Sequence, residues 1–244
     1  MARPTTDKPS YDYKTHCLNR GYIDIIEKFR NGLKVGPITL RLVDIARGRF
    51  REEINARLLF ESGGTASHIA ALKIFCGRGL IYKPWIEIFN INNRIVLENG
   101  SVIGFFDSPL EDALLDAITG KIGPGESIFI EYYNDEETLN QFERGVPPQV
   151  TRMGLKLLRR GFTWFKVWYY PEGFQEGGQK LQAQKPLNTS AMIRQLAVLT
   201  EEINLFLNSK KRLGNDSYII KSLLYSREAL RIIDKLRRKA STRQ

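Results

Sequence analysis

The chain has 244 residues and a net charge of +10, with 42% hydrophobic, 11% aromatic and 26% charged residues. This length and balance indicate one large globular domain or one domain with an appendage, and they exclude a disordered or low-complexity chain. No apolar run is long enough to cross a bilayer, and the first residues, MARPTTDKPSYDYK, lack the apolar core of a signal peptide. We therefore expect a cytoplasmic protein with no membrane partner.

Cysteine and histidine are scarce in this sequence, which contains Cys17, Cys76, His16 and His68 and no others. Two cysteines make neither a disulfide framework nor a CxxC zinc pair, so a reducing cytosol is the default and no metal is expected. A zinc hydrolase or a serine–histidine triad would have to recruit one of the two histidines, and neither lies in a recognisable motif. We interpret His68 and Cys76 as packing residues.

The first hundred residues show mainly strand patterns. Residues 1–16 are predicted to be a loose arm, and a helix is expected over 21–31, where Gly32 suits the position after its end. Apolar alternation from residue 38 indicates a strand. Arg47-Gly48 is a turn signal, and a second strand that ends in LLFE is expected after it. More strands are expected over 70–76, 85–90 and 94–97, and Asn99-Gly100 is a strong hairpin signal before SVIGFFD. Residues 38–107 are therefore predicted to form an antiparallel meander.

Helices and strands alternate after residue 107. Ser108-Pro109-Leu110-Glu111 is a capping box with proline at the first helical position, so a helix is expected up to Gly120. The predicted elements that follow are a strand over 127–133, an acidic helix from Asn134 or Asp135 to Gly145, a basic helix over 152–160, and a strand over 162–170. A strand, a crossover helix and a strand in this order favour a parallel pair in a mixed sheet. Residues 171–188 are expected to be a loop with one short strand at QKLQA.

Residues 189–244 are predicted to form a basic helical hairpin, separate from an α+β domain over 1–188. Two apolar stripes at helical spacing are joined by KKRLGND. The segment holds twelve Lys and Arg against five Asp and Glu, a balance of +7, which leaves +3 for the first 188 residues. This asymmetry indicates weak binding to an anionic partner such as nucleic acid, with a solvated basic helix face as the equally weighted alternative. The clustered cations are Lys210, Lys211, Arg212, Arg237, Arg238 and Lys239.

The stretch GVPPQVTRMGLKLLRRGFTWFKVWYYPEG, residues 145–173, places a proline-braced turn and a helix start directly before an aromatic strand. A phosphate group needs several backbone N–H donors at one spot, and a helix N-terminus supplies them with a favourable dipole. A glycine in the first turn permits close approach because it has no Cβ. The turn is therefore a candidate phosphate site, and an ordinary loop–helix–strand unit is the alternative.

These residues resemble the coenzyme A pyrophosphate loop of the GCN5-related N-acetyltransferase superfamily, which reads Gln/Arg-x-x-Gly-x-Gly/Ala and often follows Val-x-Pro. Val146-Pro147-Pro148 precedes the loop, Gln149 and Gly154 match its outer positions, and Arg152 replaces its first glycine. An acidic helix intervenes before the loop, and the usual final helix and strands are not evident after Tyr170. The cofactor-binding residues implied by the resemblance are Gln149, Val150, Thr151, Arg152, Met153 and Gly154.

The resemblance covers roughly residues 94–170. It implies an acyl-CoA N-acyltransferase-like α+β fold, with a mixed, mostly antiparallel sheet flanked by helices, and acetyl-CoA or another acyl-CoA as cosubstrate. The whole chain is also similar to a family of uncharacterised, mainly archaeal proteins, through TRMGLKLLRRGFTWFKVWYYPEG and EGGQKLQAQKP. That family carries no established activity.

Acyl transfer to an amine needs a base for the ammonium and an acid for the leaving thiolate. Glu131, a polar residue within the apolar strand SIFIEYY, is the candidate base, and Tyr169 and Tyr170 are candidate acids. Glu172 and Glu176, in the glycine-rich loop PEGFQEGGQK, would suit a cationic amine on a small molecule or a protein. The alternatives are a solvent-facing strand residue, tyrosines packed in the core and a surface loop.

The sequence therefore favours a coenzyme A-dependent N-acyltransferase that acts on an amine. One alternative is a nucleic-acid-binding protein that uses the basic C-terminal helices, although these have few aromatic residues for base stacking. The other is a non-catalytic scaffold on a degenerate transferase fold. The sequence carries no signal for an oligomeric state.

Overall fold

The computed structural model describes residues 11–17, 19–77, 83–97, 99–168 and 179–190, and parts of the chain beyond them. Those parts are residues 192–193, 196–197, 200, 226–227, 229–236 and 238. The chain divides into two compact units, one of residues 1–77 with 84–185 and one of residues 78–83 with 186–244.

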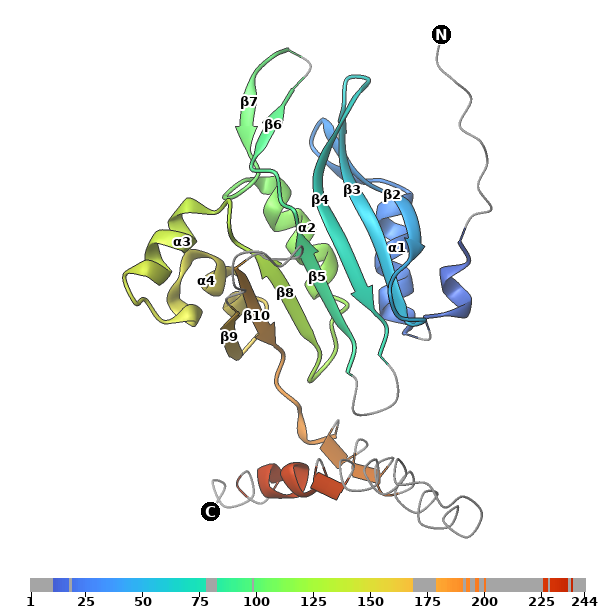
Figure 1. The fold of residues 1–244 in the computed structure, drawn as a ribbon, viewed down its shortest axis with the longest axis vertical. Helices are drawn as coiled ribbons and strands as arrows, with labels where there is room; N and C mark the ends of the chain where they lie inside the picture. The colour runs from blue at the N-terminus through green and yellow to red at the C-terminus, as the bar shows by residue number, and fades with distance from the viewer. Residues whose placement is uncertain are drawn as a thin grey trace. The chain divides into compact units, whose positions relative to one another are not determined.

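The first unit combines β-strands with helices that connect them (Figure 1). Its strands are β1 (Leu33–Val35), β2 (Ile38–Arg47), β3 (Glu53–Ser62), β4 (Thr65–Phe75), β5 (Trp85–Phe89), β6 (Arg94–Val96), β7 (Val102–Gly104), β8 (Ser127–Glu131), β9 (Trp164–Trp168) and β10 (Lys180–Gln184). Its α-helices are α1 (Arg20–Arg30), α2 (Pro109–Thr119), α3 (Glu136–Glu143) and α4 (Arg152–Arg159), and its 3-10 turns are η1 (Tyr13–Thr15) and η2 (Pro148–Val150).

Eight strands form one open sheet in the order β1-β2-β3-β4-β5-β8-β10-β9. Strands β2 to β5 are the predicted antiparallel meander, but β6 and β7 form a hairpin of their own outside this sheet. The predicted parallel pair is wrong in its partners, because β10 lies between β8 and β9 and is antiparallel to both. The parallel neighbours are β5 and β8, joined through β6, β7 and α2. The sheet is therefore mixed and mostly antiparallel, as expected.

Local capping signals place the helix ends close to where the sequence predicts them. The Ser108 side chain accepts a hydrogen bond from the Glu111 N–H, and Glu111 in turn accepts one from the Asp107 N–H. Asp135 and Thr151 cap α3 and α4 in the same way. Gly161 follows α4 with a φ of +86°, a conformation in which a Cβ would be strained.

The helices share a single hydrophobic core with one face of the sheet. Buried residues of α1, α2 and α4 belong to the same cluster as alternate residues of the strands, and Figure 1 shows α1 and α2 behind the sheet. A row of fully buried side chains crosses five strands in register: Ile54, Ile74, Ile86, Ile128 and Ala183. This rigid sheet holds the ends of β5 and β8 side by side.

Described residues of the second unit are helical where the sequence predicts the hairpin. Met192 is buried with Ala229 and Ile232, and Leu187, Leu196 and Leu236 pack around them. Met192, Leu196 and Leu236 of the predicted stripes therefore belong to this contact, whereas Ile193, Leu230 and Ile233 are exposed. Of the predicted basic cluster, Arg238 pairs with Asp234 at 2.7 Å, and Lys210, Lys211, Arg212, Arg237 and Lys239 lie outside the described residues.

A disulfide joins Cys17 to Cys76. Both sulfurs are buried, and the bond ties the segment that follows η1 to the end of β4. Residues 1–16 are thus not wholly a loose arm, since Tyr13 is buried in the core. Because the two cysteines are 59 residues apart, no local spacing signals the bond. The presence of only two cysteines therefore does not indicate a reducing compartment for this protein.

We predict that the Cys17→Ser/Cys76→Ser double variant is less stable than the wild type by about 4 kcal/mol. The bond closes a loop of 59 residues, and the chain-entropy model gives about this value for such a loop. Guanidinium chloride unfolding, followed by circular dichroism with and without dithiothreitol, measures the effect. Reductant should destabilise only the wild type, and identical wild-type curves in both conditions would contradict the bond.

Candidate functional site

The N-terminus of α4 holds the turn predicted to bind a pyrophosphate, and its backbone donors are already bonded. The Arg152 N–H donates to the side-chain oxygen of Gln141 at 2.7 Å, and the Met153 N–H to the Thr138 hydroxyl at 3.4 Å. The Gly154 N–H donates to the hydroxyl of Thr151 at 3.1 Å. No N–H of residues 152–154 is left for a phosphate oxygen. Gln149 and Val150 lie on the surface in η2.

Gly154 has a packing role in this turn. A Cβ built on it would lie 1.8 Å from the carbonyl oxygen of Pro148, far inside any real contact. The glycine therefore lets η2 fold back against the first turn of α4. The geometry accounts for this glycine without a ligand and does not favour a pyrophosphate at residues 149–154.

Arg152 is buried, with 8% of its surface exposed, and it binds carboxylates from two other helix starts. Its guanidinium donates to Glu111 at 2.8 and 3.0 Å, to Asp107 at 3.2 Å, and to both oxygens of Asp135. Burial alone would lower the pKa of Arg152, but the hydrogen bonds and charges of Glu111 and Asp135 outweigh it and raise that pKa. The guanidinium is therefore permanently charged.

Three helix N-termini converge on this guanidinium. Glu111 lies in the first turn of α2, Asp135 caps α3, and Arg152 begins α4. A helix N-terminus attracts anions, and here the buried carboxylates of Glu111 and Asp135 supply them. The protein thus carries its own anions where the sequence predicts those of coenzyme A.

The ion pairs continue along α2 and α4. Lys156 lies 2.7 Å from Glu111 and 3.2 Å from Asp107, and Arg160 lies 3.0 Å from Asp112 and 2.7 Å from Asp116. Residues 152, 156 and 160 recur every four positions, so they share one helix face. We call this set of cations and carboxylates the α2–α4 ladder. It fixes the two helices in register.

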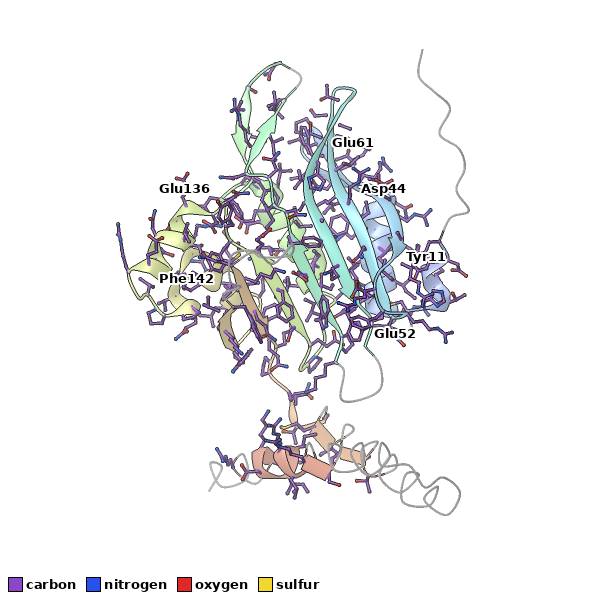
Figure 2. The ribbon with its side chains drawn as sticks, in the orientation of Figure 1. Tyr11, Asp44, Glu52, Glu61, Glu136 and Phe142 are labelled. Carbon is purple, nitrogen blue, oxygen red and sulfur yellow. A yellow bond between two sulfur atoms is a disulfide. The ribbon has the colours of Figure 1, made fainter. Side chains whose placement is uncertain are left out.

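A pocket of about 320 Å³ lies beside the ladder, where the chain leaves the carboxyl ends of β5 and β8. We call it the acidic pocket. The residues that line it are Asn93, Phe106, Asp107, Asp135, Glu136, Glu137 and Arg152. Asp107, Glu136 and Glu137 are exposed, and Glu136 projects from the start of α3 in Figure 2. In open sheets, ligands gather at such strand ends where a crossover separates the strands.

Asp107 has an unusual backbone, with a φ of +62°. Partial burial would raise the pKa of its carboxyl, but Lys156 and Arg152 outweigh that effect and lower it. Asp107 is therefore ionised at neutral pH and adds negative charge to the acidic pocket. Non-glycine residues at positive φ concentrate at functional sites.

Glu131, the predicted base, ends β8 and is half buried. Its carboxylate accepts a hydrogen bond from the Asn90 N–H, just beyond the end of β5. This contact joins the two parallel strands where they end, so Glu131 has a structural role there. The predicted acids and substrate carboxylates, Tyr169, Tyr170, Glu172 and Glu176, lie outside the described residues.

A buried charge cluster that the sequence did not predict lies on the face of the sheet opposite the hydrophobic core. Glu87, in β5, pairs with Lys180 of β10 and lies 4.0 Å from Lys73 of β4. Both ammonium groups also lie over the ring of Phe89. The available signal was one acid within the apolar strand WIEIF, the same signal that singled out Glu131.

These features define an α+β protein with an open mixed sheet and an acidic pocket at the ends of its parallel strands. The chain belongs to the family described as "Protein of unknown function (DUF1122)", whose sequence profile matches residues 36–210. It is also similar to a solved structure, a protein of unknown function, AQ1966, from Aquifex aeolicus VF5. The two chains are 33% identical with a TM-score of 0.58, over 88% of this chain and 98% of that one.

No curated protein matches this chain. Within the part of the chain that the structure describes, no helix is long and apolar enough to span a bilayer. The same residues contain no group of three or more His, Cys, Asp and Glu arranged to hold a metal ion.

We predict that Arg152→Met destabilises the protein by about 3–5 kcal/mol, because it leaves Asp135 buried without its cation and Glu111 with Lys156 alone. Urea unfolding at neutral pH measures the loss. Arg159→Met is the matched control, since Arg159 is exposed on the same helix and should change stability by less than about 0.5 kcal/mol. Equal effects of the two substitutions would show that the ladder contributes nothing specific.

We predict that Gly154→Ala destabilises the free protein by about 1–3 kcal/mol, because the added methyl group meets the Pro148 carbonyl. Thermal unfolding without any ligand measures this effect. If Gly154 served only to admit a phosphate, the variant would keep wild-type stability and lose only ligand binding.

Proposed function

We propose that the protein binds a small cationic amine in the acidic pocket and transfers an acyl group to it. The observation that carries this proposal is the charge of the pocket wall. Asp107, Glu136 and Glu137 are exposed carboxylates around a cavity of about 320 Å³. The cation in the wall, Arg152, is already bonded to the buried carboxylates of Glu111 and Asp135, and Asp107 also pairs with Arg152 and Lys156. The pocket therefore presents excess negative charge, which complements an ammonium group.

The chemistry of the transfer requires that the bound ammonium lose a proton and that the free amine attack the thioester carbonyl. The thioester bond then breaks and coenzyme A leaves as its thiolate, which takes up a proton. Glu131 is kept as the proposed base, acting through water. It ends β8 and does not itself line the pocket, so a water molecule would have to connect it to the bound amine.

An acyl-CoA remains the proposed donor, on the strength of the N-acyltransferase resemblance and of a mixed sheet with parallel strands at its centre. The bonded donors of residues 152–154 weigh against the predicted pyrophosphate position. Amine binding and coenzyme binding are therefore separate parts of the proposal and are tested separately.

A second candidate function is a non-catalytic scaffold on a degenerate transferase fold. One specific observation favours it. The buried carboxylates of Glu111 and Asp135 already neutralise the helix starts that an acyl-CoA pyrophosphate would use. A scaffold of this kind would bind no coenzyme and release no thiol.

We predict that spermidine binds to the protein. Asp107→Asn and Glu136→Gln should each raise its Kd about fivefold, because each removes one exposed ion pair with the amine. Isothermal titration calorimetry at low and physiological salt measures the affinity. Glu143→Gln is the control, because Glu143 is exposed on α3 but does not line the pocket. No heat at millimolar spermidine, or an equal effect of the control, would contradict amine binding.

Catalysis is tested by thiol release from acetyl-CoA in the presence of the bound amine. Release that depends on Asp107 and Glu136 supports the acyltransferase. Amine binding with no thiol release, and no thermal shift with coenzyme A, favours the scaffold.

A further inference from the structure

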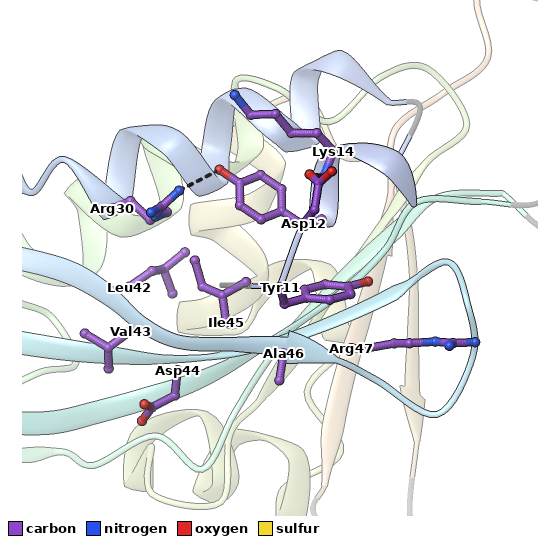
Figure 3. A pocket seen from close by; sticks show the side chains of 11 residues that line it. Tyr11, Asp12, Lys14, Arg30, Leu42, Val43, Asp44, Ile45, Ala46 and Arg47 are labelled. Atoms are coloured by element: carbon purple, nitrogen blue, oxygen red, sulfur yellow. Dashed lines mark hydrogen bonds between the residues drawn. The ribbon is translucent and has the colours of Figure 1, made fainter. Parts of the chain in front are cut away.

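A second cavity, of about 790 Å³, lies between η1, the end of α1 and the second half of β2 (Figure 3). This volume is in the range of small-molecule sites. The residues that line it are Tyr11, Asp12, Tyr13, Lys14, Arg30 and residues 42–47. Because β1 pairs only with residues 38–40 of β2, the cavity borders a part of β2 that β1 does not cover.

A β-bulge in β2 shapes the floor of this cavity. Val43 pairs with Arg57 and Ala46 with Asn55, so two residues of β2 oppose one of β3. The bulge places Asp44 at a φ of +51° and shifts the alternation of the side chains. In Figure 3, Leu42 and Ile45 therefore point to the same side of β2. With the ring of Tyr13, they give the cavity an apolar surface.

One end of the cavity carries a hydroxyl and a guanidinium. The hydroxyl of Tyr11 is buried and has no hydrogen-bond partner among the residues that the structure describes. Burial raises the pKa of Tyr11, against the opposing charge of Arg47, so the hydroxyl is protonated and can donate at neutral pH. Figure 3 shows Tyr11 and Arg47 at the same end and Arg30 at the other. A buried donor without a partner requires an explanation, and a bound acceptor supplies one.

Two of the remaining charges of the cavity form ion pairs, and the other two, Arg30 and Asp12, are hydrogen-bonded to neutral groups. Lys14 pairs with Glu27, Asp44 pairs with Arg57, and Arg30 donates to the Tyr13 hydroxyl. Asp12 caps η1 by accepting from the Lys14 N–H. Among the described residues Arg47 forms no ion pair. The cavity therefore offers an anion one cationic end beside an apolar floor.

We propose that this cavity binds a small organic anion with an aromatic or aliphatic body. The acid group lies between the hydroxyl of Tyr11 and the guanidinium of Arg47. The body lies over Leu42 and Ile45, against the ring of Tyr13. This site is independent of the acidic pocket, whose charge favours cations.

The test uses 8-anilinonaphthalene-1-sulfonate as the anionic probe and N-phenyl-1-naphthylamine as the same aromatic body without the sulfonate. Fluorescence titrations of the full chain are compared for the wild type, Arg47→Gln, Tyr11→Phe and Arg51→Gln. Arg51 is the control because it is exposed in the β2–β3 turn and does not line the cavity. Circular dichroism melting curves check that each variant is folded.

We expect saturable binding of the sulfonate to the wild type. Arg47→Gln should weaken it about tenfold, through loss of an ion pair, and Tyr11→Phe about threefold, through loss of a hydrogen bond from an uncharged donor. Arg51→Gln should keep wild-type affinity, and no variant should change the affinity for the neutral probe. The proposal is overturned if the sulfonate does not saturate, if Arg51→Gln weakens it as much as Arg47→Gln, or if Arg47→Gln weakens both probes equally.

Discussion

The arrangement of helices α2, α3 and α4 depends on one buried guanidinium. Each of these helices begins near Arg152, and each would otherwise direct the positive end of its dipole at the others. Glu111 and Asp135 neutralise these ends, and Arg152 together with Lys156 in turn neutralises the two carboxylates. Because a buried charge without a partner is costly, all three groups must be present together. The position of the acidic pocket beside them follows from this requirement.

The two pockets of the first unit differ in charge and in the way the backbone forms them. The acidic pocket lies where the parallel strands β5 and β8 end, and its wall consists largely of residues at helix starts. The cavity beside β2 arises from an extra residue in a strand at the side of the sheet, which turns Ile45 inward. One pocket therefore suits a cation and the other an anion, although the chain as a whole is strongly basic.

Local signals predicted much of the fold, and distant contacts account for what they missed. Asn99-Gly100, the Ser108–Glu111 capping box and Gly32 each act within a few residues, and the structure confirms each of them. The partners of Arg152 lie 17, 41 and 45 residues away in the sequence, so its role could not be inferred from the turn alone. The same holds for the disulfide of Cys17 and for the insertion of β10. A glycine and an arginine near a helix start resemble a phosphate loop whether the anion is a ligand or a carboxylate of the protein itself.

The insertion of β10 sets an order in which the sheet can be completed. Strand β9 precedes β10 in the chain, yet it joins the sheet only by pairing with β10. During synthesis, a nascent chain that ends at Trp168 has β8 with one bare edge and β9 with no strand beside it. The aromatic residues of β9 then have no place on the sheet until Gln184 has been added. This part of the sheet therefore closes late, and incomplete chains present an unpaired strand edge of the kind that favours aggregation.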